Sequence, residues 1–214
     1  MIVERVAKKD DNTVVIYLDN NEKLFLSYEV LLKNGLKKGS EISEDRFSLL
    51  VVQNRKYHIR QKAITFLAKR IHSKRELENK LRKKNYEIEL IKAVLDKLEE
   101  KGLIDDNAFA NQFTEEKLNR KKWGLQKIKS ELLKKGVSPD IVNKVLKSFA
   151  DSESQLESAI DVAKKKLNLI SKKESDKKKI KQKLSAFLLS RGFDYEISRD
   201  AVNKLIIKEE DYYE

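Results

Sequence analysis

The sequence predicts a mainly α-helical protein, with tandem three-helix repeats forming an elongated array and a small N-terminal β-meander. The main observation is a helical phrase that occurs three times, at spacings of 51 and then 56 residues. Each copy has two apolar residues four apart on one helix face. Four residues later comes a Gly or Asn, which suits the left-handed backbone where a helix ends. The copies are Leu77/Leu81/Asn85, Ile128/Leu132/Gly136 and Leu184/Leu188/Gly192. Because stacked repeats bury one another's apolar faces, the pattern favours an extended binding surface over an active-site cleft.

Residues 1–56 are expected to form a small β-rich region with short helices. Three apolar β-forming runs, Ile2–Val6, Val14–Leu18 and Leu24–Leu26, are separated by polar turn triplets, which predicts a meander. A short helix should follow at 28–34 and end at Gly35, and a second should start near Ser43. A region this small should pack against the first repeat to complete its hydrophobic core. The sequence does not indicate its function.

The remaining chain is expected to hold three-helix repeats at 57–102, 103–150 and 151–214, the last including an acidic tail. The expected helices cover about 58–71, 74–84 and 87–101, then 105–121, 124–135 and 139–150, then 152–170, 177–191 and 195–207. Long heptads are absent, which argues against a coiled coil. Residues with capping chemistry mark several helix starts: Ser73 with Glu76, Ser152 with Gln155, Ser138 before Pro139, and Asp194.

The composition excludes several kinds of site. The chain has 47 Lys and Arg against 35 Asp and Glu, a net charge of +12, which favours an anionic partner such as nucleic acid. It has no cysteine, so disulfides and thiolate metal sites are excluded. His58 and His72 are the only histidines, and neither has a neighbouring acidic ligand pattern, so structural or surface roles are expected. We expect no catalytic residue, no metal and no cofactor, because no Gly-rich phosphate loop or nucleophile–base pair occurs.

The sequence also gives an expectation about location. The N-terminus has no apolar signal core, and no apolar run approaches the length that spans a membrane. We therefore expect a cytoplasmic protein without a membrane partner, and a monomer.

Positive charge is concentrated in three blocks. The net charge is +6 over residues 69–84, +7 over 117–135 and +8 over 164–183. Each block surrounds the corner between the first and second helix of its repeat. In a stacked array, these corners would form a stripe that suits an extended phosphate backbone or the groove of a filament. The alternative is that they are solvated helix faces without a ligand.

Three segments resemble a known family. They are Arg70-Ile-His-Ser73-Lys-Arg-Glu76-Leu77 with Leu81, Gly102-Leu-Ile-Asp105-Asp106 with Phe109-Ala110, and Arg120-x₂-Trp123-Gly124 with Ile128, Leu132 and Gly136. In this order and spacing they look like RecX, bacterial regulatory proteins that modulate the RecA recombinase. The resemblance covers about 60–147 strongly and 152–206 weakly. Asn85 departs from it, because a glycine is usual there, but Asn is the next-best left-handed residue.

The resemblance implies a non-enzymatic regulator. RecX-like proteins lodge in the helical groove of the RecA–single-stranded-DNA filament and hinder filament growth, ATP hydrolysis and strand exchange. A stand-alone helical DNA-binding protein is the alternative, since three-helix units resemble helix-turn-helix domains. The second helices begin with phosphate-binding rather than base-reading residues, which argues against a sequence-specific reader. A period of 51–56 residues and a single proline argue against a peptide-binding tetratricopeptide scaffold.

The corners of repeats one and two supply the candidate contacts with DNA or the RecA filament. Trp123 stands beside three cations, so its indole can stack on a base while the cations meet phosphates, or it can anchor the core. Asp105 and Asp106 are paired carboxylates at the start of a helix, where capping is the expected role. The candidate residues are Lys69, Arg70, Lys74, Arg75, Arg120, Lys121, Lys122, Trp123 and Lys127.

Overall fold

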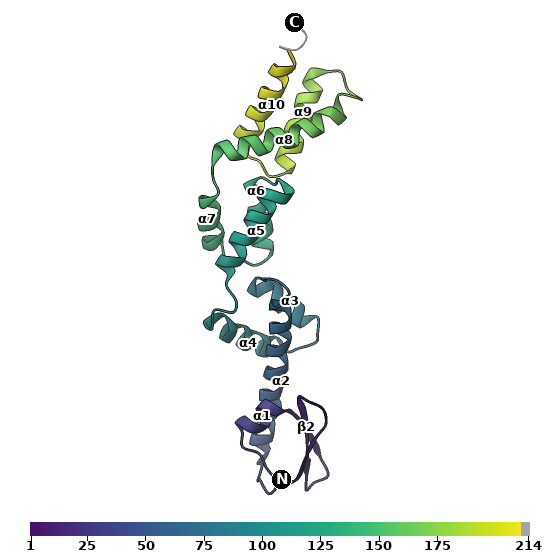
Figure 1. Cartoon of the computed structure of the whole chain (residues 1–214), viewed down its shortest axis with the longest axis vertical. Helices are drawn as coiled ribbons and strands as arrows, with labels where there is room; N and C mark the ends of the chain where they lie inside the picture. Colours follow the sequence, from purple (N-terminus) through teal and green to yellow (C-terminus); the bar gives the residue numbers. More distant parts are fainter. Residues whose placement is uncertain (211–214) are drawn as a thin grey trace. The chain divides into compact units, whose positions relative to one another are not determined.

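The computed structural model describes the backbone of residues 1–210 and the side chains up to residue 206 (Figure 1). Three strands come first, β1 (Val3–Lys8), β2 (Thr13–Leu18) and β3 (Lys23–Ser27), and they pair antiparallel in that order. The inner face of this sheet packs on α1 (Tyr28–Lys33) and on the start of α2 (Glu44–Leu67). The predicted β-meander and the predicted short helix are therefore confirmed.

Helix α2 differs from the expectation. The sequence predicted one helix starting near Ser43 and another at about 58–71, but a single helix of 24 residues runs from Glu44 to Leu67. The side chain of Ser43 caps it by accepting a hydrogen bond from the Arg46 N–H. No Gly or Pro interrupts this stretch, so nothing in the local sequence ends the helix. Its first half buries Leu50 in the N-terminal core, and its second half buries Ile59 and Ala63 in the core of the first repeat.

The chain divides into two compact units. The first comprises Met1–His72 with Leu77–Ile104, and the second comprises Ser73–Glu76 with Asp105–Glu214. The first unit contains most of α3 (Lys74–Arg82) and all of α4 (Ile88–Glu100). Because α2 takes part in both cores of this unit, the expected boundary at residue 56 falls inside a helix. The division into four regions stays a prediction.

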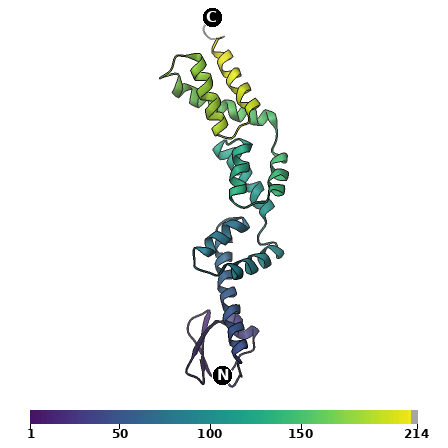
Figure 2. The same cartoon turned by 180° about the vertical axis from the view of Figure 1, so that it is seen from behind.

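The second unit contains the remaining helices, in two groups of three. They are α5 (Asp106–Lys121), α6 (Leu125–Lys134) and α7 (Pro139–Ser148), followed by α8 (Ser152–Ile170), α9 (Lys177–Ser190) and α10 (Tyr195–Glu210). The core of the last group joins α8, α9 and α10, and Figure 2 shows these helices packed together from behind. Mainly helical architecture with three-helix repeats is confirmed. Residues 211–214 of the expected acidic tail lie outside the described part of the chain.

The repeated phrase ends its helix in every copy. Asn85, Gly136 and Gly192 have φ values of 59°, 78° and 89°, in the left-handed region that the phrase predicted. Pro139 is at the first position of α7 after Ser138, and Asp194 accepts a hydrogen bond from Ile197 N–H, as expected. One cap was wrong. Asp151, not Ser152, caps α8, because its carboxylate accepts the free N–H groups of Glu153 and Ser154.

Among the described residues, no helix is both long enough and apolar enough to cross a membrane.

Candidate nucleic-acid interface

A basic groove of about 440 Å³ lies in the second unit, where the end of α5 meets α8 and α9. Its floor is apolar, and its remaining lining is made only of cations, without a carboxylate. A concave surface of this composition suits a chain of phosphates with apolar groups between them. The lining cations are Arg120, Lys121, Lys122, Lys165, Lys166 and Arg191, and the apolar residues are Val162, Leu169 and Phe187.

The last turn of α5 brings three cations to one edge of the basic groove. Arg120 and Lys121 end the helix, and Lys122 follows in the left-handed conformation with a φ of 48°. The Lys122 N–H donates to the carbonyl of Lys117, which closes the helix without a glycine. All three side chains are exposed, so they are available to an anionic ligand.

A close backbone contact joins the start of α6 to the end of α9. Gly124 N–H donates to the carbonyl of Arg191 at 2.9 Å, and Gln126 N–H donates to the carbonyl of Gly192 at 3.0 Å. A Cβ at Gly124 would overlap the backbone of Gly192 and Phe193. Glycine is therefore required here for a close approach rather than for an unusual φ, and the contact sets the cations of 120–122 beside those of α8 and α9.

Cations of the basic groove lie close to its aromatic ring. The Lys166 ammonium lies 5.4 Å from the centroid of the Phe187 ring, and the Arg191 guanidinium carbon lies 5.7 Å from it. Leu169 is 61% exposed and adds apolar surface to the lining. Nε of Arg191 is buried and has no hydrogen-bond partner among the described residues.

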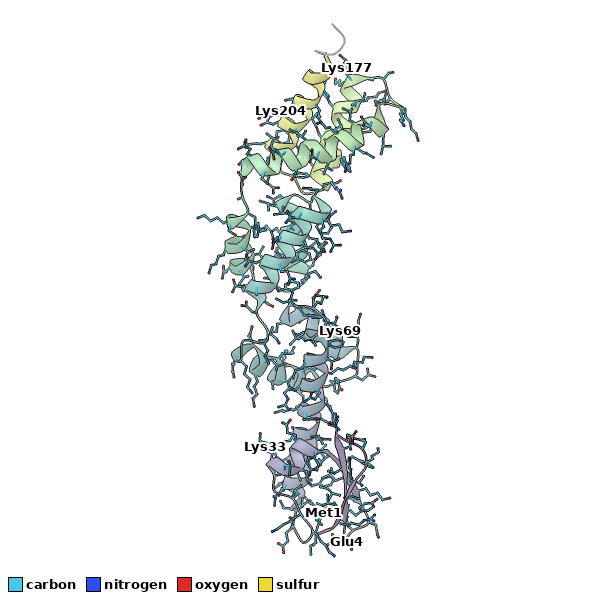
Figure 3. The ribbon with its side chains drawn as sticks, in the orientation of Figure 1. Met1, Glu4, Lys33, Lys69, Lys177 and Lys204 are labelled. Atoms are coloured by element: carbon cyan, nitrogen blue, oxygen red, sulfur yellow. The ribbon has the colours of Figure 1, made fainter. Side chains whose placement is uncertain are left out.

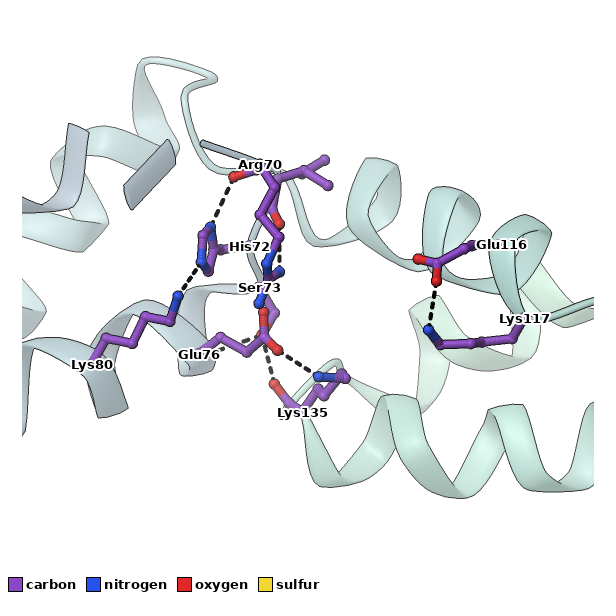
Figure 4. Close-up of polar contacts among 9 residues, drawn as sticks. Arg70, His72, Ser73, Glu76, Lys80, Glu116, Lys117 and Lys135 are labelled. Carbon is purple, nitrogen blue, oxygen red and sulfur yellow. Dashed lines mark hydrogen bonds and ion pairs between the residues drawn. The ribbon is translucent and has the colours of Figure 1, made fainter. Parts of the chain in front are cut away.

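Cations near the end of α5 lower the pKa of the neighbouring Glu116 carboxyl group. The pKa of Glu116 is lowered, first by a hydrogen bond from the Lys117 ammonium at 2.8 Å and further by the nearby charges of Arg120 and Lys121 (Figure 4). The lowered pKa of Glu116 thus reflects mainly its pair with Lys117, with a smaller contribution from the cations at the end of α5.

Trp123 and Lys127 lie outside the lining of the basic groove. Trp123 is half-buried, and the ammonium groups of Lys127 and Lys117 lie 4.8 Å and 5.8 Å from its ring centroid. Lys117 also lies 4.8 Å from the ring of Phe113. The indole is thus part of a row of cation–π contacts within the protein. Whether Trp123 stacks on a base or anchors the core stays a prediction.

The predicted residues at the corner of the first repeat are not among the lining residues of the basic groove. Lys69 and Arg70 are exposed after α2 in the first unit, and Lys69 projects from the ribbon in Figure 3. Lys74 and Arg75 group with the second unit, where a Cβ at Gly136 would overlap the Arg75 side chain. These four predicted residues therefore do not belong to the basic groove.

The segment Ser73–Glu76 is held by polar contacts within the second unit (Figure 4). Ser73 Oγ donates to the carbonyl of Lys135 at 2.7 Å and accepts the N–H of Glu76 at 3.1 Å. The Glu76 carboxylate pairs with the Lys135 ammonium. Ser73 and Gly124 each lie four residues before the first apolar residue of the phrase. Ser73 Oγ bonds the carbonyl of Lys135, one residue before Gly136, and Gly124 N–H bonds the carbonyl of Arg191, one residue before Gly192. The two residues thus hold corresponding positions in their repeats.

The paired aspartates cap, as expected. Asp105 accepts hydrogen bonds from the N–H groups of Asn107 and Ala108. Asp106 accepts the N–H of Lys74 at 2.9 Å, a contact that the sequence did not reveal. Within the part of the chain that the structure describes, no cluster of His, Cys, Asp and Glu could hold a metal ion.

His72 has a structural position in the first unit. It is 1% exposed, its Nδ1 lies 2.8 Å from the carbonyl of Arg70, and its Nε2 lies 2.6 Å from the Lys80 ammonium. Because a carbonyl only accepts and an ammonium only donates, this network assigns a neutral ring with the proton on Nδ1. A buried, bonded histidine supports the expected structural role.

The sequence did not identify the α8 and α9 side of the basic groove. Lys165 and Lys166 were included in the third basic block, but the block contains ten lysines and no local feature separates these two from the rest. Arg191 and Phe187 carried no signal, because their role depends on packing against a loop more than sixty residues earlier.

Comparison with known proteins agrees with the observed repeats. The chain matches three family models in order, described as the first, second and third three-helix domains of RecX, at 60–98, 105–146 and 153–202. Curated relatives called regulatory protein RecX include those of Clostridium botulinum and Clostridium acetobutylicum, each 34% identical. The first match covers 94% of this chain and 93% of the relative, and the second covers 90% and 89%.

Two solved structures share the fold. A crystal structure of regulatory protein RecX matches 92% of this chain and 96% of its own, with a TM-score of 0.77 and 23% identity. A crystal structure of RecX from Lactobacillus salivarius matches 72% of this chain and 99% of its own, with a TM-score of 0.64 and 24% identity. These similarities extend to the N-terminal region as well as the helical repeats, since the first spans nearly the whole chain.

Proposed function

The chain belongs to the RecX family of regulatory proteins, and we propose that it regulates the RecA recombinase by binding the RecA–single-stranded-DNA filament. Bound there, it lowers ATP hydrolysis, strand exchange and filament growth. It acts without catalysis of its own, as a cytoplasmic monomer. Family membership supports a regulatory role, and the proposal adds the target and the direction of the effect.

The basic groove is the observation that carries the DNA part of this proposal. Its six cations come from α5, α8 and α9, and no carboxylate in its lining opposes them. Lys and Arg side chains that neutralise phosphates release condensed counterions, which drives binding to any nucleic-acid sequence. Phe187 at the floor offers a ring against which an unpaired base can pack, and double-stranded DNA has no such free base. The chemistry therefore favours a single strand, as in a RecA filament.

Sequence-independent binding also fits regulation of a filament. The lining contains no Asn, Gln or Glu to read adenine or cytosine edges, and its Lys and Arg side chains suit phosphates as well as guanine. Contacts with phosphates position a protein on DNA but carry no base information. A regulator of a filament formed on many sequences needs this property.

ATP hydrolysis by preformed RecA–single-stranded-DNA filaments tests the proposal. Adding this protein in excess at moderate salt should lower the rate, and the effect should weaken as salt increases. Binding to the same DNA without RecA is measured in parallel. An unchanged ATPase rate together with tight binding to bare DNA would contradict the proposal and favour a stand-alone DNA-binding protein.

A further inference from the structure

The first unit contains a second concave surface, which we call the apolar groove. It has a volume of about 350 Å³ and lies where α1, α2 and α4 meet. Its floor is mostly aliphatic, and Leu49 in α2 is 53% exposed within it. The apolar lining residues are Val30, Leu49, Tyr57, Ala93, Val94 and Leu98. An exposed leucine over a concave aliphatic floor is a typical site for a side chain from a partner.

Five cations surround the apolar groove. Lys33 comes from α1, Lys56 and Arg60 come from α2, and Lys97 and Lys101 come from α4 and its C-terminal cap. Lys33 is seen beside α1 in Figure 3. Gln53 is the remaining uncharged polar residue of the lining. Cations from three separate helices thus lie around one apolar floor.

Glu29 is the single carboxylate in this lining, and it is already paired. Its Oε2 lies 2.5 Å from Nη2 of Arg60. The pKa of Glu29 is lowered, first by this hydrogen bond and further by the charges of Arg60, Lys33 and Lys101. The pair leaves four lysines around the floor without a carboxylate from the lining to balance them. The field of the apolar groove therefore favours an anionic ligand.

We propose that the apolar groove is a docking site for an acidic peptide segment of a partner protein, with an aliphatic or aromatic side chain seated against Leu49, Val94 and Leu98. Carboxylates on either side of that anchor meet Lys33, Lys56, Lys97 and Lys101. The charge is complementary, and the aliphatic floor supplies the apolar contact that a peptide anchor needs. This inference does not depend on the proposed function, because all of its residues lie in the first unit.

The floor distinguishes a peptide from a nucleic acid. Each groove has a single aromatic ring in its lining, Phe187 in the basic groove and Tyr57 here. They differ in their aliphatic residues, which number two in the basic groove and five in the apolar groove, and aliphatic side chains offer no face for base stacking. Aliphatic floors instead accept leucine, isoleucine or phenylalanine from peptides. The lining therefore favours a peptide, and a DNA oligonucleotide becomes the competing outcome of the test.

The test uses the full chain and a short synthetic peptide in which glutamates alternate with leucine and phenylalanine. Amide chemical shifts of the isotope-labelled protein are followed during titration. We expect saturable changes around Leu49, Val94 and Leu98. Two control peptides, one with serine in place of the apolar residues and one with lysine in place of glutamate, should cause much smaller changes. Absence of saturable changes, or equal changes with the lysine peptide, would overturn the proposal.

Variants of the lining give a second readout. Lys97→Glu together with Lys101→Glu should weaken peptide binding about three- to tenfold, because exposed charges each contribute modestly. Leu49→Ser should weaken it about tenfold or more through lost apolar contact. Lys83→Glu together with Lys92→Glu is the matched control, since both lysines are exposed in the first unit but are not part of the lining. Equal losses in the control would contradict a specific site.

Two further outcomes would assign a different occupant. Single-stranded oligothymidylate producing the same shifts more tightly than the acidic peptide would identify a nucleic-acid site and overturn the peptide proposal. The chain's own C-terminus, Glu209-Glu210-Asp211-Tyr212-Tyr213-Glu214, is also acidic and aromatic. A truncation after residue 208 that shifts the same amides would show that this segment occupies the groove instead of a partner.

Discussion

Gly124 and Gly192 meet backbone to backbone, in a contact that leaves no space for a side chain at residue 124. The hydrogen bond from Gly124 N–H to the Arg191 carbonyl accompanies this approach. The two glycines belong to different repeats, and their contact places the end of α5 beside α9. The basic groove depends on it.

Gly124→Ala tests this contact. The φ of Gly124 is −75°, which alanine adopts freely, so a loss of stability would come from steric overlap, against a smaller gain from the stiffer unfolded chain. The overlap involves backbone atoms of Gly192 and Phe193, which cannot move aside as a flexible side chain does. We expect a loss of about 1–3 kcal/mol in the free energy of unfolding. Denaturant titration measures it, and stability equal to that of the unmodified protein would show that the contact is not close.

Gly136→Val tests the helix-ending phrase. The φ of 78° is strained for a β-branched residue, and the new side chain would also overlap Arg75. A loss of about 1–3 kcal/mol is expected from the backbone alone. Gly102→Val is a matched control, because Gly102 has a φ of 69° but no atom within 4 Å of a new Cβ. The Gly136 variant should melt at a lower temperature than the Gly102 variant. Equal melting temperatures would show that overlap with Arg75 adds no cost to the strained backbone.

Asn85→Gly should be close to neutral. Asn85 already adopts a φ of 59°, so glycine relieves modest strain in the folded chain and adds freedom to the unfolded chain. These effects oppose each other. A change of several degrees in melting temperature would indicate that the Asn side chain has a role beyond ending α3.

Glu29→Gln should destabilise the protein at neutral pH but not in acid. The folded-state pKa of Glu29 is lowered below its ordinary value of 4.5, so its contribution is present above that value. It is lost as the pH falls through the folded-state pKa. Exposed ion pairs contribute about 0.2–1 kcal/mol, so a small difference is expected. Unfolding free energies at neutral pH and at a pH below the lowered folded-state pKa of Glu29 give the comparison, and a difference that persists unchanged in that acid would contradict it.

Local features of the fold were predictable from the sequence, and tertiary ones were not. Asn85, Gly136 and Gly192 end helices because of their own backbone preferences, so the repeated phrase identified them. The continuity of α2 was missed, although the absence of Gly and Pro from 44–67 allowed it to be recognised. At the candidate site, the sequence identified 120–122 as a basic corner. The partners Lys165, Lys166 and Arg191 depend on the Gly124–Gly192 contact, which no local pattern reveals.

Removing the cations at the end of α5 should weaken binding to single-stranded DNA without unfolding the protein. In the triple variant Arg120→Ala/Lys121→Ala/Lys122→Ala, the log–log salt slope should fall by about 1.4–2.1 if two or three phosphates lose their contacts. The loss should be similar for different DNA sequences. Circular dichroism should show unchanged helicity, because all three side chains are exposed.

A matched variant separates position from charge. Lys92, Lys144 and Lys204 are exposed lysines outside the basic groove, and replacing all three by Ala removes the same charge. This control should keep most of the affinity and the salt slope. If both variants lose the same affinity for single-stranded DNA, residues 120–122 form a solvated helix face and not a DNA-binding site.

The most direct measurement of the central claim is the inhibition of ATP hydrolysis by preformed RecA–single-stranded-DNA filaments, compared among three proteins. The unmodified chain and the Lys92/Lys144/Lys204 control should both lower the rate. The Arg120/Lys121/Lys122 variant should require a concentration about tenfold or more higher for the same effect, as expected for two or three lost phosphate contacts. Equal inhibition by all three proteins would contradict a role for the basic groove. No inhibition by the unmodified chain would contradict regulation of RecA itself.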